Sequence, residues 1–151
     1  MNLLNNLKQR GLAAVEMAIT TPLLLLVMFA TAELGRVWMQ YNTLTKAVRD
    51  SVRYVASNAS PGQLGVINLT EKTISDAQNL AVFGNTAGSG QPLLPSLDPS
   101  SISVAASGAD DIVVTATYVY QPMNPIIPGF GVGPNRESLF TLEAQATMRA
   151  L

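Results

Sequence analysis

One carboxylate stands inside the most apolar part of this sequence. Glu16 is followed by an uncharged run, residues 17–32, that is rich in leucine, methionine, alanine, valine and phenylalanine. A carboxylate is costly to bury in such a run, and ionisable residues of membrane segments commonly mark a functional position or have a specific partner. Position alone leaves a second interpretation open, in which Glu16 lies near the interface and reaches toward lipid headgroups.

The composition excludes most catalytic chemistry. The chain has no histidine and no cysteine, which removes imidazole bases, Ser-His-Asp triads, thiolates and disulfides. Its formal net charge of -1 argues against nucleic acid as a partner. We therefore expect no catalytic residue, no cofactor and no metal site, and the chain is not expected to be an enzyme.

The apolar run predicts a transmembrane helix over residues 12–34, since about 20 residues cross a bilayer. A cleaved secretory signal is the competing interpretation, with Ala30-Thr31-Ala32 as the cut site. The apolar residues, however, continue beyond that site at spacings of three and four, which predicts an amphipathic continuation of the same helix over residues 35–57. Those residues are Leu34, Val37, Trp38, Tyr41, Leu44, Val48, Val52 and Val55. A retained anchor explains this continuity better than a removed signal.

Two positions on the predicted helix have simple physical roles. Pro22 removes one backbone hydrogen bond and should kink the long helix over residues 12–57, called the stem below, at membrane level. Thr20 and Thr21 can satisfy the backbone groups that the proline frees. Glu33 and Arg36 lie one helical turn apart, which predicts a local ion pair at the membrane edge.

Residues 58–151 are predicted to form a domain outside the membrane. A helix is expected over 71–83, capped by Thr70 and ended by Gly84. Three β-rich segments follow, at 102–107, 112–120 and 139–149. The second and third alternate, with one face made of Ile112, Val114, Ala116, Tyr118 and Tyr120 and the other of Phe140, Leu142, Ala144, Ala146 and Met148. The expected fold class is α+β: a long N-terminal helix whose upper half packs on a small C-terminal antiparallel sheet.

The N-terminal third of the chain resembles a known family. Gly11 ends a short basic leader, residues 1–11, and Glu16 is the fifth residue after it, as in the cleavage region of type IV pilin-like precursors. The runs 10–18, 21–26, 32–36 and 47–54 resemble TadE-like proteins, the minor pilin-like components of tight-adherence (Tad/Flp) pili. The resemblance implies a pilin-like fold and cleavage after Gly11 by a prepilin peptidase. Leu12 would then carry the new, methylated amine, and Glu16 would neutralise the Leu12 amine of a neighbouring subunit.

The resemblance implies a structural function: a minor pilin (pseudopilin) needed for assembly of an adhesion pilus. Its implied partners are the prepilin peptidase, other pilin and pseudopilin subunits, the inner-membrane assembly platform and membrane lipid. Lys8 and Arg10 on the short leader favour a cytoplasmic N-terminus, so the domain would be periplasmic and the chain a single-pass protein of the bacterial inner membrane. The alternative is a monomeric, membrane-anchored binding module that joins no filament.

Overall fold

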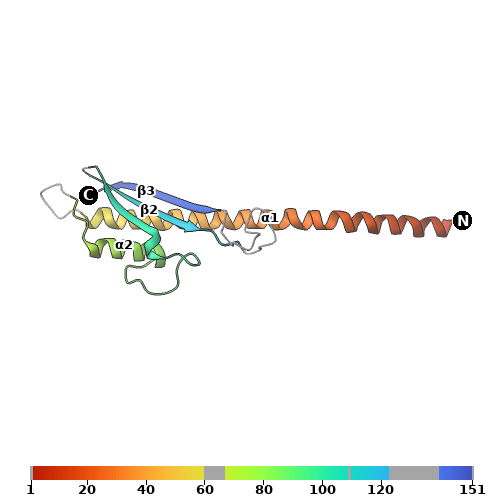
Figure 1. Cartoon of the computed structure of the whole chain (residues 1–151), viewed down its shortest axis with the longest axis horizontal. Helices are drawn as coiled ribbons and strands as arrows, with labels where there is room; N and C mark the ends of the chain where they lie inside the picture. The colour runs from red at the N-terminus through yellow and green to blue at the C-terminus, as the bar shows by residue number, and fades with distance from the viewer. Residues whose placement is uncertain (1, 60–66, 109, 123–139, 151) are drawn as a thin grey trace.

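The computed structural model describes residues 2–59, 67–108, 110–122 and 140–150, and the side chains among them from Leu12 onward. One long helix runs the length of the molecule, and all other elements gather beside its C-terminal half (Figure 1). In chain order the elements are α1 (Asn2–Asn58), α2 (Glu71–Phe83), the short 3-10 helix η1 (Pro99–Ser101), β1 (Ile102–Ser107), β2 (Asp111–Val119) and β3 (Thr141–Arg149). The expected α+β class, a long helix with a small antiparallel sheet, is confirmed.

Helix α1 has 57 residues, about 85 Å at the usual rise of an α-helix. It begins at Asn2 and so includes the leader, for which the sequence predicted no helix. The difference has a local reason: residues 2–11 contain no proline, and a single glycine weakens a helix without ending it. The other end agrees with the prediction to within one residue. There the Ser57 hydroxyl and the Asn58 amide donate to the carbonyl oxygen of Tyr54, at 2.9 and 2.7 Å.

Helix α2 has the predicted bounds and the predicted caps. The Thr70 hydroxyl accepts a hydrogen bond from the Thr73 amide at 3.2 Å. Gly84 adopts a φ of 74°, a left-handed conformation that favours glycine, and its amide donates to the Leu80 carbonyl at 2.9 Å. These two residues therefore fix both ends of the helix through short-range contacts that the sequence already displays.

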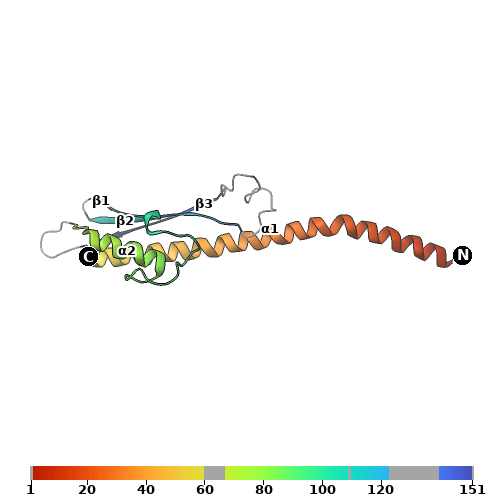
Figure 2. The same cartoon turned by 60° about the horizontal axis from the view of Figure 1, so that its bottom comes forward.

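Helix α2 lies alongside the last turns of α1 (Figures 1 and 2). Close approach is possible because alanines face the stem: Ala77 and Ala81 are fully buried. The buried Ser51 hydroxyl donates to the Ala77 carbonyl at 2.8 Å, and the Tyr54 hydroxyl donates to the Asp76 carboxylate at 3.1 Å. Both bonds tie the stem to α2, and neither was foreseen from the sequence.

The sheet is antiparallel with the order β1-β2-β3. The predicted inner face of β2 is confirmed, since all five of its residues are buried: Ile112, Val114, Ala116, Tyr118 and Tyr120. The strand itself is shifted by one residue from the prediction, 111–119 rather than 112–120. Tyr120 is nevertheless still tied to the neighbouring chain segment, because its amide donates to the Phe140 carbonyl at 3.0 Å.

The third strand, β3, begins at Thr141, and residue 139 of the predicted strand lies outside the described residues. Its predicted inner face is buried only in the middle: Ala144 is buried, Leu142 and Ala146 are half-buried, and Phe140 and Met148 are exposed. The reason is that β3 is an edge strand, with β2 on one side only, so it has fewer neighbours than β2 to cover its residues.

The core lies between the sheet and the upper half of α1, as predicted. Figure 2 shows the sheet as a separate layer along the stem and α2. From the stem, the buried residues Leu44, Val48, Val52 and Val55 enter this core. The lower half of α1 contributes no residue to it, and the two halves of one helix therefore face different surroundings.

Candidate functional site

The lower part of α1 exposes its apolar side chains on all sides. Among the described residues this is the one helix long and apolar enough to cross a membrane, and none of its most apolar window is buried within the molecule. The large exposed side chains are those of Leu12, Val15, Met17, Ile19, Leu23, Leu24, Leu25, Leu26, Val27, Met28 and Phe29. A surface apolar all round is typical of a helix whose surroundings are lipid or other apolar helices.

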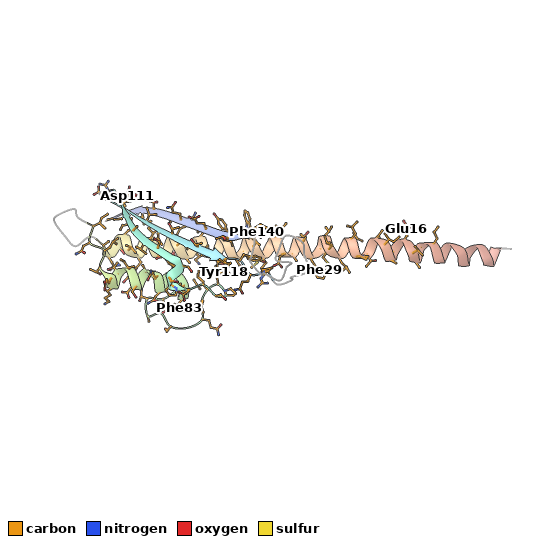
Figure 3. The ribbon with its side chains drawn as sticks, viewed as in Figure 1. Glu16, Phe29, Phe83, Asp111, Tyr118 and Phe140 are labelled. Atoms are coloured by element: carbon orange, nitrogen blue, oxygen red, sulfur yellow. The ribbon has the colours of Figure 1, made fainter. Side chains whose placement is uncertain are left out.

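Glu16 belongs to this exposed apolar part of α1, residues 12–32, which is called the bare segment below. Its side chain is exposed, and its carboxylate makes no hydrogen bond or ion pair within the described part of the chain. Figure 3 shows it standing out from the stem far from the domain. Leu12 is also exposed, and Gly11 lies within the helix.

Pro22 lies inside α1, and Figure 2 shows the helix bending gently in its N-terminal part, which contains this residue. The Thr20 hydroxyl donates to the Glu16 carbonyl at 2.9 Å. Proline has no N–H, so Pro22 leaves the carbonyl of Ala18, four residues back, without its usual donor. The carbonyl that Thr20 bonds to is therefore a different one. Thr20 thus adds a bond one turn below the proline.

A buried hydrogen bond lies at the upper end of the bare segment. The Tyr120 hydroxyl donates to the Glu33 carboxylate at 2.5 Å, and the two residues are 1% and 5% exposed. A short bond to a carboxylate in buried surroundings is among the stronger hydrogen bonds of proteins. It joins the end of β2 to the point on α1 where exposure of the stem gives way to burial.

Further polar side chains gather at this junction. Glu33, Arg36 and Gln40 follow each other at spacings of three and four, so they lie on one face of α1. Three of the atoms here are buried and have no hydrogen-bond partner in the described part of the chain: Nη1 of Arg36, Oε1 of Gln40 and the hydroxyl of Tyr118. Polar atoms without partners are uncommon in protein interiors.

Burial, followed by the hydrogen bond to Glu33 and its negative charge, raises the pKa of Tyr120 far above the ordinary value of a tyrosine. Arg36 acts in the opposite direction on Tyr120 and on Tyr118, whose pKa is raised by burial. The junction therefore keeps both phenols protonated, and the Tyr120 hydroxyl stays a donor to Glu33.

The ion pair predicted between Glu33 and Arg36 stays a prediction. The salt bridge recorded among the described residues joins Arg149 to Asp110 at 2.7 Å, in the turn at the far end of the sheet. Asp110 is thus a turn residue with a cationic partner. The bond from Tyr120 to Glu33 was missed at the sequence level. Its two residues are 87 positions apart, and the only available signal was a tyrosine at the inward-facing end of a strand.

A hollow of about 330 Å³ lies between α1 and α2. Its lining mixes charged and apolar residues, among them Lys46, Asp50, Leu80 and Leu93. A hollow of this kind is what a membrane-anchored binding module would offer a small ligand, although no cluster of acid-base groups lines it.

Comparison with known families supports the resemblance seen in the sequence. Residues 11–53 match the model of the family described as TadE-like protein. The match begins at the glycine before the bare segment and ends within α1, so it lies entirely on the stem. The comparisons with curated proteins and with solved structures found no match.

The junction yields a first prediction. Tyr120→Phe removes the hydroxyl that Glu33 accepts from, and we expect it to lower the free energy of unfolding by about 1.5–3 kcal/mol, the usual range for a hydrogen bond to a charged group. The matched control is Tyr118→Phe, on the same buried face of β2, because that hydroxyl has no hydrogen-bond partner in the described chain. Denaturant unfolding of the full chain in detergent micelles measures both variants, and equal losses would contradict the role given to Tyr120.

A second prediction concerns alkaline pH. The unfolded chain releases the tyrosine proton at a pH of about 10, whereas the raised pKa of Tyr120 keeps it protonated in the folded state. The associated stability is therefore fully present below about pH 10 and is lost as the pH rises toward the folded pKa. Between about pH 10 and the folded pKa, the free energy of unfolding should fall more steeply with pH in the parent chain than in Tyr120→Phe. Parallel curves for the two proteins would mean that Tyr120 does not titrate as described.

Proposed function

From the match of residues 11–53 to the TadE-like family, we propose that this chain is a structural, minor-pilin-like subunit of a tight-adherence (Tad/Flp) pilus. The observation that carries the proposal is the bare segment, an apolar helix exposed on every side with a glycine at its start. Five residues after that glycine stands Glu16, a carboxylate without a partner among the described side chains. A helix of this kind needs lipid before assembly and other apolar helices after it. The domain beside the upper half of α1 serves the assembly as the head that the stem carries.

Cleavage by a prepilin peptidase after Gly11 is the first step proposed for the subunit. Glycine, with no side chain, lets a catalytic site approach the backbone closely. Cleavage removes the basic leader and leaves a new amine on Leu12, at the cytoplasmic end of the apolar segment. The short positive leader keeps that end in the cytoplasm, and the domain is carried to the periplasmic side of the inner membrane.

Pairing of Glu16 with the Leu12 amine of a neighbouring subunit is the second step. Both charges are costly in an apolar medium, and each lowers the cost of the other when they meet. A bundle of apolar helices has little to oppose sliding, so one charge pair sets the axial register between two subunits. The exposed position of Glu16 on the stem leaves it accessible to such a neighbour.

The partners of the subunit follow from these steps: the prepilin peptidase, other pilin and pseudopilin subunits, the assembly platform of the inner membrane, and lipid. The continuous stem supports this role, because α1 runs unbroken from the leader into the domain core. A subunit registered at Glu16 therefore also has a fixed height for its head.

Processing can be tested by mass spectrometry of the mature protein. We expect the parent chain to lack residues 1–11 and to begin at Leu12, and Gly11→Leu to retain the leader because a bulky side chain obstructs the scissile bond. The matched control is Gly35→Leu, on the same helix, where an added Cβ meets nothing within 4 Å. A parent chain that still begins at Met1 would overturn the processing step.

Pairing can be tested with Glu16→Gln, which keeps the shape of the side chain and removes its charge. We expect the variant to insert into the membrane as before but to decrease in sheared pili on the order of tenfold or more, since about 1.4 kcal/mol per contact already changes an equilibrium tenfold. Glu143→Gln, on the exposed face of β3, serves as the control for loss of one carboxylate. An unchanged amount of Glu16→Gln in sheared pili would contradict the charge pair. Absence of the parent chain itself from sheared pili would favour an anchored binding module instead.

A further inference from the structure

The stem stays apolar on one side above the level of Glu33. Leu34, Trp38 and Tyr41 follow each other at spacings of four and three, which puts them on one face of α1. Their side chains are 59%, 68% and 40% exposed, although Glu33 and Gln40 in the same turns are buried. Exposed side chains of this size in a row indicate a surface that another medium covers.

This apolar stripe ends at a definite height. Above Tyr41 the row that continues the stripe enters the core at Val48 and Val52. Beside that row, the exposed residues of the stem are polar: Asn42, Lys46, Arg49 and Arg53. Leu12 to Ala32 spans about 30 Å of helix, the thickness of the hydrocarbon core of a bilayer. Leu12 to Tyr41 spans about 44 Å, close to the thickness of a bilayer with both headgroup layers included.

The lower end of the domain reaches the same level. Tyr120 is bonded to Glu33, one residue below Leu34, and its neighbour Val119 is 54% exposed on the outer face of β2. Figure 3 shows Phe140 and the beginning of β3 beside the stem at this end of the domain, between Tyr118 and Phe29. Apolar side chains from the stem and from the domain are thus exposed at about the same height.

We propose that these residues, Leu34, Trp38, Tyr41 and Val119, form an apolar collar that sits in the lipid headgroup layer and seats the domain directly on the membrane surface. The inference rests on the membrane span of the proposed function and adds a contact between the domain and lipid. Tryptophan and tyrosine are enriched at this depth, because each has an apolar ring and a polar group.

Lipid fits the collar better than a second copy of the chain does. The collar continues the span without a break, through Leu34, and it changes to polar residues at one height on the open face. A protein partner would follow the stem along its axis and would have no reason to stop where the headgroup layer stops.

The chain contains its own probe, because Trp38 is its one tryptophan. The full chain is reconstituted in phosphatidylcholine vesicles brominated either near the acyl carbonyl or near the chain end. We expect the Trp38 emission to be blue-shifted and to lose more intensity with the shallow bromines than with the deep ones. Aqueous iodide should quench it only weakly. Emission as in water, quenched by iodide and by neither lipid, overturns the collar. Blue-shifted emission that no bromolipid quenches and that reverts on dilution of the protein in lipid also overturns it, in favour of a second copy.

Three variants in a Trp38→Phe background separate this inference from the proposed span. Phe29→Trp should be quenched best by the deep bromines, and its failure would remove the span itself. Val119→Trp should be quenched by the shallow bromines. Its matched control is Asp111→Trp, at the opposite end of β2 on the same outer face and about 26 Å away, which no bromolipid should quench. Deep quenching of Phe29→Trp with Val119→Trp unquenched would leave the span intact and refute the seated domain.

Discussion

The burial of the Glu33 carboxylate under the Tyr120 hydroxyl divides the stem into its two environments. Below this bond, α1 exposes apolar side chains on every side, and above it the same helix supplies the core of a domain. The buried Glu33 carboxylate is shielded from solvent, so a hydrogen-bond donor of the protein has to replace the water that would otherwise solvate it. Because the partner, Tyr120, directly follows β2 and faces inward, the height of the sheet on the stem is set by the same contact.

The helices were predictable because their signals are local. The bounds of α2 followed from Thr70 and Gly84, whose capping bonds involve residues three or four positions away. The inner face of β2 followed from strict alternation. The strand shift of one residue and the exposed ends of β3 did not, because they depend on how the strands pair and pack against the stem. The leader was predicted as a separate segment, yet nothing within it opposes the helix that runs through it.

The contacts that hold the domain to the stem were beyond sequence reasoning for a different reason. Ser51 bonds to a carbonyl of α2, and Glu33 bonds to Tyr120, so each pair joins residues far apart in the chain. No spacing rule relates such pairs. The candidate processing segment is the reverse case, because Gly11, Leu12 and Glu16 stand out in the sequence. The isolated molecule adds only the helix that contains all three and the exposure of Leu12 and Glu16, since the proposed partner of Glu16 belongs to another subunit.

The direction of the strands relative to the stem has a mechanical consequence. In Figure 1, β2 and β3 run along α1, and their shared core includes Leu44, Val48 and Val52. Tension along the stem therefore loads this interface in shear, so that many side-chain contacts must give way together. A sideways pull would separate the same contacts one after another. The molecule is consequently strongest along its own long axis, the axis along which a helix leaves a bilayer.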